Sequence, residues 1–248
     1  MKPLLAAFRF LTILPLGRRP ERSEDLAGSV LFFPPVGLFI GIVALIVDSV
    51  ALAALPSLPA AACTVLVLIA LSGGLHMDGL ADTADGFGSA RPRERVLEIM
   101  RDSRIGTMGV VAVVSAILLK VVFLDAVPLS LRIQAVILMP VAGRSALVWS
   151  MAWLPYARSE GGLATAFHRK VSSVHALWAL VFLLACGAGM GGWPGVAAAA
   201  MVLAVISGWL VICRRKIGGF TGDTLGASCE IAEIVPVIVL ALWPSLGI

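Results

Sequence analysis

The chain has 248 residues, of which 59% are hydrophobic and only 14% are charged. A soluble domain carries roughly 25% charged residues, and the apolar residues of this chain gather into runs near the ~20 residues that cross a bilayer as a helix, which excludes an ordinary soluble fold. The net charge of +4 does not indicate nucleic-acid binding, because membrane proteins carry Lys and Arg on their cytoplasmic loops.

The first segment, residues 4–16, is apolar apart from Arg9, and a charged stretch follows it without a small-residue cleavage site. This pattern predicts an N-terminal amphipathic helix at the membrane interface rather than a cleaved signal peptide.

The rest of the chain predicts an all-α, polytopic membrane bundle, and we read residues 1–248 as one integral-membrane domain. About seven transmembrane helices are expected, at residues 33–55, 59–76, 107–126, 132–154, 173–190, 194–213 and 228–246. Short, almost uncharged connections alternate with connections that hold most of the 19 Lys and Arg. By the positive-inside rule, the N-terminus and the charged loops face the cytoplasm from the inner membrane.

The connection at about residues 76–106 is rich in acids. Asp78, Asp82 and Asp85 are spaced i, i+4, i+7, which places them on one face of a helix. Three like charges raise one another's pKa unless a cation or Arg lies among them, and carboxylate oxygens suit Mg²⁺. We therefore expect these three to be metal ligands; a solvated acidic face paired with nearby Arg side chains is the alternative.

A short helix is expected at residues 92–101, with Pro92 at its first turn. At its end, Arg101 and Arg104 are candidates for bidentate binding of phosphate, and Asp102 is a candidate catalytic acid. The alternative is a surface helix whose charges pair with one another.

A second acidic motif covers about residues 218–233. Asp223, Glu230 and Glu233 open the last span, where carboxylates are costly and therefore functional candidates, and Thr221 can help hold an anion. Within the fourth span, Arg144 can reach an anionic substrate or pair with an intramembrane Glu.

The two acidic motifs also share a pattern. Gly73-Gly74 precedes Asp78 as Gly218-Gly219 precedes Asp223, so two Gly-Gly hinges would deliver an Asp to the same membrane face. His76 adjoins the acids but is a weaker candidate, because a lone His more often packs or donates a hydrogen bond.

Together these features indicate acids for a metal, Arg for phosphate and no nucleophile with a recognisable base. That combination is typical of direct phosphoryl-group transfer, in which charge neutralisation and positioning do most of the catalysis. A carboxylate can take the proton from the acceptor hydroxyl.

Five segments resemble the cobalamin synthase family, also called adenosylcobinamide-GDP ribazoletransferase. They are Phe10–Pro15, Phe32–Gly37, Gly74–Gly86, Arg101–Thr107 and Gly219–Ala227 followed by Glu230. The resemblance implies an inner-membrane enzyme that joins adenosylcobinamide-GDP to α-ribazole or its 5′-phosphate, releases GMP and requires Mg²⁺. It spans essentially the whole chain.

We combine the resemblance with the residue chemistry as a hypothesis. Asp78, Asp82 and Asp85 would hold Mg²⁺ on the diphosphate, and Arg101 and Arg104, with Arg144 and Thr221, would bind phosphate. Asp223 and Glu230 would complete the metal site or activate the ribose hydroxyl. Beyond its substrates, the expected partner is the lipid bilayer; an oligomer is compatible with the sequence, and no nucleic acid is expected.

Two other functions would fit parts of the sequence. A CDP-alcohol phosphotransferase shares the Asp82-x2-Asp85-Gly86 spacing, but the second half of that family's motif fails, with Arg104 and Met108 at its last two Asp positions. An ion-coupled transporter would explain the intramembrane charges, but the acids are concentrated in a loop rather than at the bilayer midplane.

Overall fold

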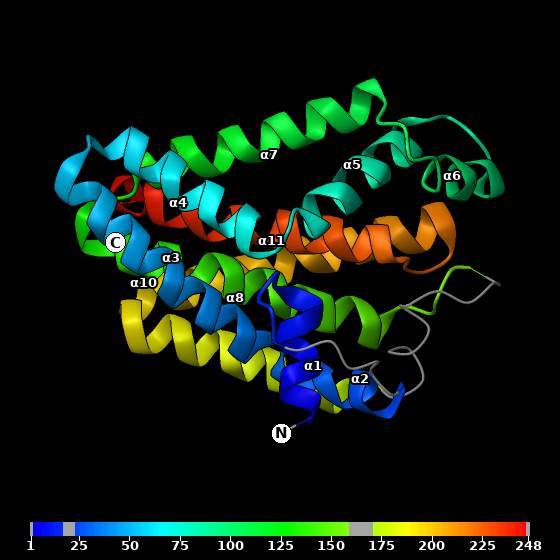
Figure 1. The fold of residues 1–248 in the computed structure, drawn as a ribbon, viewed down its shortest axis with the longest axis horizontal. Helices are drawn as coiled ribbons and strands as arrows, with labels where there is room; N and C mark the ends of the chain where they lie inside the picture. The colour runs from blue at the N-terminus through cyan, green and yellow to red at the C-terminus, as the bar shows by residue number, and fades with distance from the viewer. Residues whose placement is uncertain (1, 17–22, 159–170, 247–248) are drawn as a thin grey trace.

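The computed structural model describes residues 2–16, 23–158 and 171–246, and these form an all-helical bundle without a strand. The helices in chain order are α1 (Lys2–Leu11), α2 (Ser23–Ser29), η1 (Val30–Phe32), α3 (Phe33–Ala54), α4 (Ser57–Leu71), α5 (Leu75–Gly88), α6 (Arg93–Ile99), α7 (Thr107–Ala126), α8 (Leu129–Trp153), α10 (Ser173–Ile217), α11 (Gly222–Leu242) and η2 (Trp243–Leu246). Most of the long helices run along the long axis of the molecule (Figure 1). The predicted all-α polytopic bundle is confirmed.

Helix α8 is the centre of the bundle. Every residue from Ala135 to Met151 is buried, because α3, α10 and α11 pack around it. A helix that is buried on all sides needs no polar face, which explains why its sequence lacks an amphipathic stripe. On α7, by contrast, Leu118 and Val122 are more than half exposed, as expected for side chains that face lipid.

Two glycines bring α3 into close contact with α8. A Cβ on Gly37 would lie 2.5 Å from the carbonyl oxygen of Pro140, and one on Gly41 would lie 3.0 Å from Cα of Ile137. This Gly-x3-Gly spacing lets helix backbones approach closely in membranes. Arg132 of α8 also holds Asp48 of α3 through two 2.9 Å hydrogen bonds near the other end of the same interface.

The predicted count of seven spans is not confirmed. Within the described parts of the chain, five helical stretches are long and apolar enough to cross a bilayer: Leu26–Ala54, Thr107–Ala126, Leu129–Trp153, Gly192–Ile217 and Gly222–Ser245. The expected second span, residues 59–76, is mostly α4, which is too short to count as a span by itself. Helices α4 and α5 meet at 89° and pass the test for a span only together, giving up to six spans. Ser173–Gly189 is a shorter apolar helix.

The bend between α4 and α5 has a backbone cause. Gly73 and Gly74 adopt φ values of 62° and 74°, a left-handed conformation that side chains disfavour. The break ends α4 after 15 residues and turns α5 away, so the acidic segment expected to be a loop is a helix packed on α7 and α11. Helix α5 does not span a membrane by itself.

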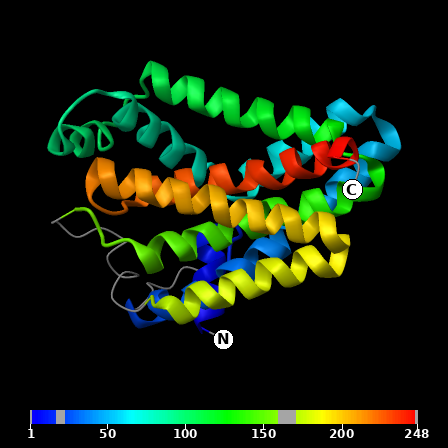
Figure 2. The same cartoon turned by 180° about the vertical axis from the view of Figure 1, so that it is seen from behind.

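Helix α10 is a hairpin rather than one rod. Gly192 breaks it with φ 56°, and its two limbs fold back on each other (Figure 2). Gly187 and Gly195 touch backbone to backbone near the turn, where neither has room for a Cβ. The short, uncharged connection expected between residues 190 and 194 is therefore present as the break at Gly192.

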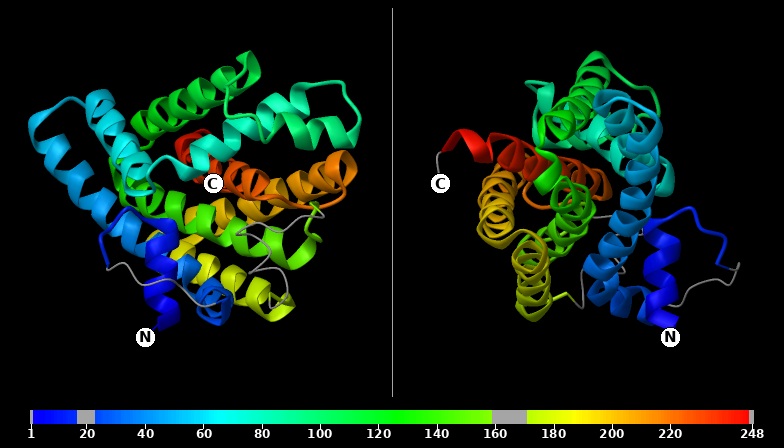
Figure 3. Two further views of the ribbon diagram at one scale, coloured as in Figure 1. Left: turned by 45° about the vertical axis from the view of Figure 1, so that its right-hand side comes forward. Right: turned by 90° about the vertical axis from the view of Figure 1, so that its left-hand side faces the viewer.

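The N-terminal helix predicted from the sequence is α1, and it ends at Leu11 rather than at residue 16. Its Ala6, Ala7 and Leu11 are buried, and the backbone N–H of Ile13 donates to the carbonyl oxygen of Leu71 at the end of α4. Helix α1 lies across the bundle beside α3, whereas α5, α6 and the start of α11 meet at one end of the molecule (Figures 1 and 3).

Candidate functional site

The two acidic motifs of the sequence face each other across α5 and α11. Gly79 and Gly226 let these helices touch: a Cβ on Gly79 would lie 2.7 Å from the carbonyl oxygen of Asp223, and one on Gly226 would lie 3.0 Å from that of His76. Gly73-Gly74 precedes α5 and Gly218, at φ 78°, ends α10 just before α11. The two hinges thus bring Asp78 and Asp223 to one place, as the shared pattern predicted.

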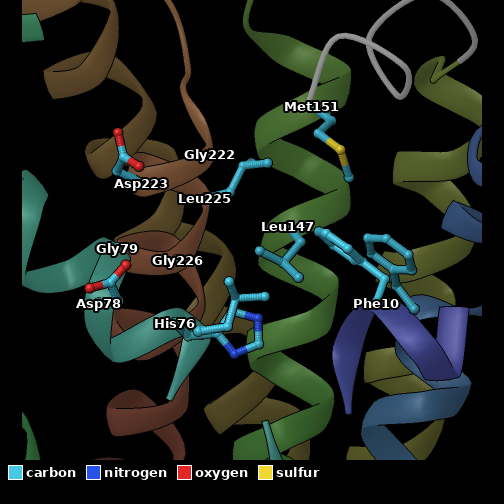
Figure 4. Close-up of a pocket in the computed structure, with 12 residues that line it drawn as sticks. Phe10, His76, Asp78, Gly79, Leu147, Met151, Gly222, Asp223, Leu225 and Gly226 are labelled. Atoms are coloured by element: carbon cyan, nitrogen blue, oxygen red, sulfur yellow. The ribbon is translucent and has the colours of Figure 1, made fainter. Parts of the chain in front are cut away.

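Asp78 and Asp223 line a cavity of about 170 Å³ that we call the apolar cavity. Its apolar lining comes from five helices and consists of Phe10, Phe33, Leu75, Leu147, Met151 and Leu225. Figure 4 shows the two carboxylates on one side and Phe10 and Met151 on the other, with His76 and Leu147 between them.

Asp82 lies one turn further along α5 and is half-buried. Burial, followed by the negative charges of Asp78, Asp223 and Asp85, raises the pKa of Asp82 to about 6, although the guanidinium of Arg158 acts against them. Like charges from two helices therefore crowd one another, as the spacing predicted, and a cation would relieve the repulsion.

Asp85 has a different environment. Its two carboxylate oxygens accept hydrogen bonds from the backbone N–H groups of Gly106, at 2.7 Å, and Gly109, at 2.8 Å. These donors lie at the start of α7, so Asp85 acts as its N-cap from another helix. Gly106 is the residue that directly precedes α7.

Asp223 is held by an arginine, Arg158, that is not among the predicted site residues. Nη2 of Arg158 lies 2.7 Å from Oδ2 of Asp223, and the hydroxyl of Thr221 donates to the same oxygen at 3.2 Å. Thr221 is fully buried and its side chain also caps α11. The structure thus places Thr221 as a support for Asp223 and for the helix start.

Backbone pairing positions Arg158. The N–H of Ala157 donates to the carbonyl oxygen of Phe220, and the N–H of Phe220 donates to that of Pro155, both at 2.9 Å. Arg93 of α6 donates to the carbonyl oxygens of Ala157 and Ile217. The segment after α8, the start of α11 and α6 are thereby joined into one frame.

Helix α6 and the segment after α8 line a second, open cavity of about 520 Å³, which we call the arginine cavity. Its lining consists of Arg93, Glu94, Leu97, Glu98, Arg101, Tyr156, Ala157 and Arg158. Arg158 lines this cavity while its partner Asp223 lines the apolar cavity, so the ion pair lies where the two cavities adjoin. Arg101, a predicted phosphate ligand, lines the arginine cavity.

Asp102 and Arg104 are not brought to either cavity. They pair with each other at 2.6 Å on the surface, where Arg104 is 87% exposed. Hydrogen bonds from Arg104 lower the pKa of Asp102 to about 2. The alternative prediction for this segment, surface charges that pair with one another, therefore holds for Asp102 and Arg104. The helix expected at residues 92–101 is present as α6.

Glu230 and Arg144 belong to a buried cluster instead. Nζ of Lys120 lies 2.6 Å from Glu230 and 2.5 Å from Glu233, and Arg144 pairs with Glu233. All four side chains are at most 4% exposed. The last helix starts at Gly222, six residues earlier than expected, which carries both Glu residues deeper into the bundle. Arg144 thus takes the intramembrane pairing named as its alternative.

Two residues of the site and the buried cluster, Lys120 and Arg158, were not predicted as functional from the sequence. Lys120 is recognisable in the sequence as a charge inside an apolar span, but its partners, Glu230 and Glu233, lie 110 and 113 residues further along the chain. Arg158 is one of three Lys and Arg residues in the connection after the fourth expected span, and nothing in the sequence distinguishes it from the other two. Only the pairing of residues 155–157 with Phe220 identifies it.

The carboxylates fit Mg²⁺ in chemistry without forming a closed cage. Among the residues that the structure describes, no three His, Cys, Asp or Glu side chains are close enough to hold a metal by themselves. Magnesium is commonly bound by one or two carboxylates together with substrate phosphates and water. The open group of Asp78, Asp82 and Asp223 suits that mode, since each contributes hard oxygens beside a cavity or a neighbouring carboxylate.

Comparison with known proteins adds independent information. The family model described as cobalamin-5-phosphate synthase matches residues 3–241. A protein of Desulforamulus reducens is 38% identical over 96% of both chains, and one of Roseiflexus sp. is 41% identical over 97% of this chain and 89% of its own; both are named adenosylcobinamide-GDP ribazoletransferase. No solved structure matches the chain. The chain belongs to the cobalamin-5-phosphate synthase family and is a membrane-embedded enzyme of the last step of cobalamin synthesis.

Proposed function

We propose that the enzyme transfers the adenosylcobinamide phosphate group from adenosylcobinamide-GDP to α-ribazole or its 5′-phosphate. The ribose hydroxyl of the acceptor forms a new P–O bond to the cobinamide-linked phosphorus. The P–O bond to the guanylyl phosphate breaks, GMP leaves, and a carboxylate takes the proton from the hydroxyl. The product is adenosylcobalamin or its 5′-phosphate.

One observation supports this proposal most strongly. The Arg158–Asp223 pair joins an apolar cavity with two carboxylates to a cavity that three arginines line. A transfer between two large substrates needs two adjoining sites, one of them suited to anions. Arginine holds phosphate oxygens bidentately, so Arg101 and Arg158 are suited to the diphosphate of the donor.

The carboxylates of the site have different roles in this proposal. Asp78 and Asp223 border the apolar cavity, where either can accept the proton of a hydroxyl that lies between them. Asp82 lies one turn further along α5, where the negative charges of Asp78, Asp223 and Asp85 act on it. Asp85 holds the start of α7 through two hydrogen bonds from backbone N–H groups. The four remaining predicted residues line neither cavity and would support the fold through their ion pairs; they are Asp102, Arg104, Arg144 and Glu230.

Asp82 and one of Asp78 and Asp223 would hold Mg²⁺, and the other of those two would take the proton. When bound, the ion would neutralise the charge that develops on the departing phosphate. The crowding that raises the pKa of Asp82 supports a cation at this position.

The site would lie on the cytoplasmic side of the inner membrane. The loops around it contain most of the basic residues of the chain, as cytoplasmic loops do. Nucleotide-linked substrates are also cytoplasmic, which agrees with this orientation.

The direct test supplies purified protein in lipid nanodiscs with adenosylcobinamide-GDP, α-ribazole phosphate and Mg²⁺ and measures GMP. We expect GMP only when both substrates and the ion are present. Asp82→Asn should abolish GMP release without preventing membrane insertion. No GMP from the wild type refutes the transfer, and a near-normal rate in Asp82→Asn refutes the metal role.

A further inference from the structure

Arg93 lines the arginine cavity, but its guanidinium is committed to the backbone. Nε donates to the carbonyl oxygen of Ile217 at 2.7 Å, and Nη2 donates to that of Ala157 at 2.6 Å. These two groups form one edge of the planar guanidinium, the kind of edge that otherwise binds a phosphate through two parallel hydrogen bonds. The other amino group, Nη1, lies 3.7 Å from Oε1 of Glu94, an exposed side chain. Little of the guanidinium is therefore left for a diphosphate.

The two carbonyl groups that Arg93 binds belong to the two segments that carry the Arg158–Asp223 pair. Ala157 directly precedes Arg158 in the chain. Ile217 is the last residue of α10, and a hinge joins it to α11, on which Asp223 lies. One side chain of α6 thus ties both halves of the ion pair together.

Helix α6 is itself fixed by a small apolar cluster. Val96 of α6 and Met100, directly after it, pack with Ala157 and Ile217, and all four residues are buried. Helix α6 has only seven residues, and an isolated helix of that length is unstable in water. This packing therefore sets the place of α6, and it presents Arg93 to the carbonyls of the same two residues.

The backbone pairing between the two segments stops one residue short of Arg158. It joins Pro155 and Ala157 to Phe220. The carbonyl of Ala157, by contrast, belongs to the planar peptide group that links Ala157 to Arg158, so its hydrogen bond to Arg93 orients that plane. From there the side chain of Arg158 reaches Asp223, with 2.7 Å between Nη2 and Oδ2.

We propose that Arg93 is a positioning residue: it holds the peptide group before Arg158 against the end of α10, so that Arg158 meets Asp223 and the arginine cavity together. Arg93 does not itself bind the diphosphate of the donor. The inference rests on the proposed function for the role of Arg158, whereas the effect of Arg93 on the ion pair is measurable without any substrate.

The first test measures the ion pair itself by thermal unfolding in nanodiscs without substrates. Arg158→Met and Asp223→Ala each break the pair, so the double variant should lose less melting temperature than the sum of the two single losses, by about 2 °C. In an Arg93→Met background the losses should add, because the two side chains no longer meet. A deviation from additivity that is unchanged in this background overturns the proposal. Losses that add in both backgrounds also overturn it, because there is then no pair to position.

The second test asks whether Arg93 acts through Arg158 or binds the donor directly. Binding of adenosylcobinamide-GDP is measured by equilibrium dialysis with Mg²⁺ but without acceptor, so that no transfer occurs. We expect Arg93→Met and Arg158→Met each to raise Kd about tenfold, and the double variant to bind no more weakly than Arg158→Met. Direct binding by Arg93 predicts instead that the two effects multiply to about 100-fold. That result overturns the proposal, as does an unchanged Kd in Arg93→Met.

Arg91→Met is the matched control. Arg91 is exposed two residues before Arg93 and lines neither cavity of the site, so the variant removes the same charge from the same end of α6. Its Kd for the donor should stay within about twofold of that of the wild type. Binding of α-ribazole should be unchanged in Arg93→Met, and an equal loss for both substrates indicates a general loss of structure and overturns the proposal. If Arg93→Met does not fold, Arg93→Lys replaces it, because lysine keeps the charge and a long stem but has no planar fork.

Failure of the inference and failure of the proposed function give different results. If the wild type binds no donor and releases no GMP, the transfer fails, while the unfolding measurements still decide whether Arg93 positions Arg158. If the donor binds and GMP is released but the ion pair is unchanged in Arg93→Met, the transfer stands and the positioning role is overturned.

Discussion

Asp82 and Asp85 lie three residues apart on α5, and their surroundings give them different chemistry. Both oxygens of Asp85 accept hydrogen bonds from the start of α7, whereas Asp82 is surrounded mainly by other carboxylates. The spacing in the sequence correctly indicated one acidic face. It could not show that Asp85 caps α7, because the two donors, Gly106 and Gly109, follow Asp85 by 21 and 24 residues. Only the folded chain brings them together.

The raised pKa of Asp82 gives a prediction about stability and pH. A carboxyl whose pKa is higher in the folded protein favours the protonated form, so its contribution to stability falls as the pH rises from about 4 to about 6. Above that range, Asp82→Asn should be more stable than the wild type in metal-free buffer, by roughly 1–2 °C because the side chain is partly exposed. Melting curves in EDTA at pH 4 and pH 7.5 measure the difference.

Mg²⁺ supplies the control for this experiment. The ion should raise the melting temperature of the wild type at pH 7.5 and have little effect on Asp82→Asn. If the variant is less stable than the wild type in EDTA at pH 7.5, the carboxylates are not in mutual repulsion.

Asp85→Asn should behave differently. The substitution removes the charge and one of two acceptors at the start of α7, so we expect a loss of about 1–2 kcal/mol in stability. The same melting assay measures it, and Mg²⁺ should not restore the loss. A variant as stable as the wild type would show that the cap contributes nothing.

At the scale of elements, the contact between α5 and α11 controls the geometry of the site. The sequence predicted most of the long helices within a few residues, because their apolar runs are long and uniform. It did not predict the 89° turn into α5, since the left-handed conformation of Gly73 and Gly74 appears only in the folded backbone. It also placed the start of the last helix too late, because the polar first turns of α11 look like a loop.

Gly79→Ala tests this contact. The new methyl group would lie 2.7 Å from the carbonyl oxygen of Asp223 and 3.1 Å from Cα of Gly226, both backbone atoms that cannot step aside. The helices must separate, at a cost of about 1–3 kcal/mol, and GMP release should fall at least about tenfold. Gly208→Ala on α10 is the matched control, because nothing lies within 4 Å of its Cβ position. Equal activity in the two variants would contradict the close contact.

At the scale of the whole molecule, a buried charge cluster joins three helices. Lys120 of α7 and Arg144 of α8 neutralise Glu230 and Glu233 of α11, so the cluster has no net charge. The sequence indicated Arg144, Glu230 and Glu233 as functional candidates in apolar spans, and Lys120 is a further charge in such a span. It could not pair them, because which faces of α7, α8 and α11 meet depends on the packing of the complete bundle.

Lys120→Met should destabilise the bundle strongly, by about 3–5 kcal/mol, because it leaves an uncompensated negative charge in the interior. Adding Glu230→Gln restores neutrality, since Arg144 still pairs with Glu233. We therefore expect the double variant to be more stable than the single one when both are followed by thermal unfolding in detergent. A double variant less stable than Lys120→Met would contradict this pairing.

The most direct test concerns Asp223, which lies where the two cavities adjoin. We would measure GMP release by Asp223→Asn in a single turnover, with both substrates and Mg²⁺ saturating. If the ion pair with Arg158 marks the reaction centre, the rate falls by about 100-fold or more, while the melting temperature stays close to that of the wild type. A rate near that of the wild type would place the chemistry elsewhere and contradict the account.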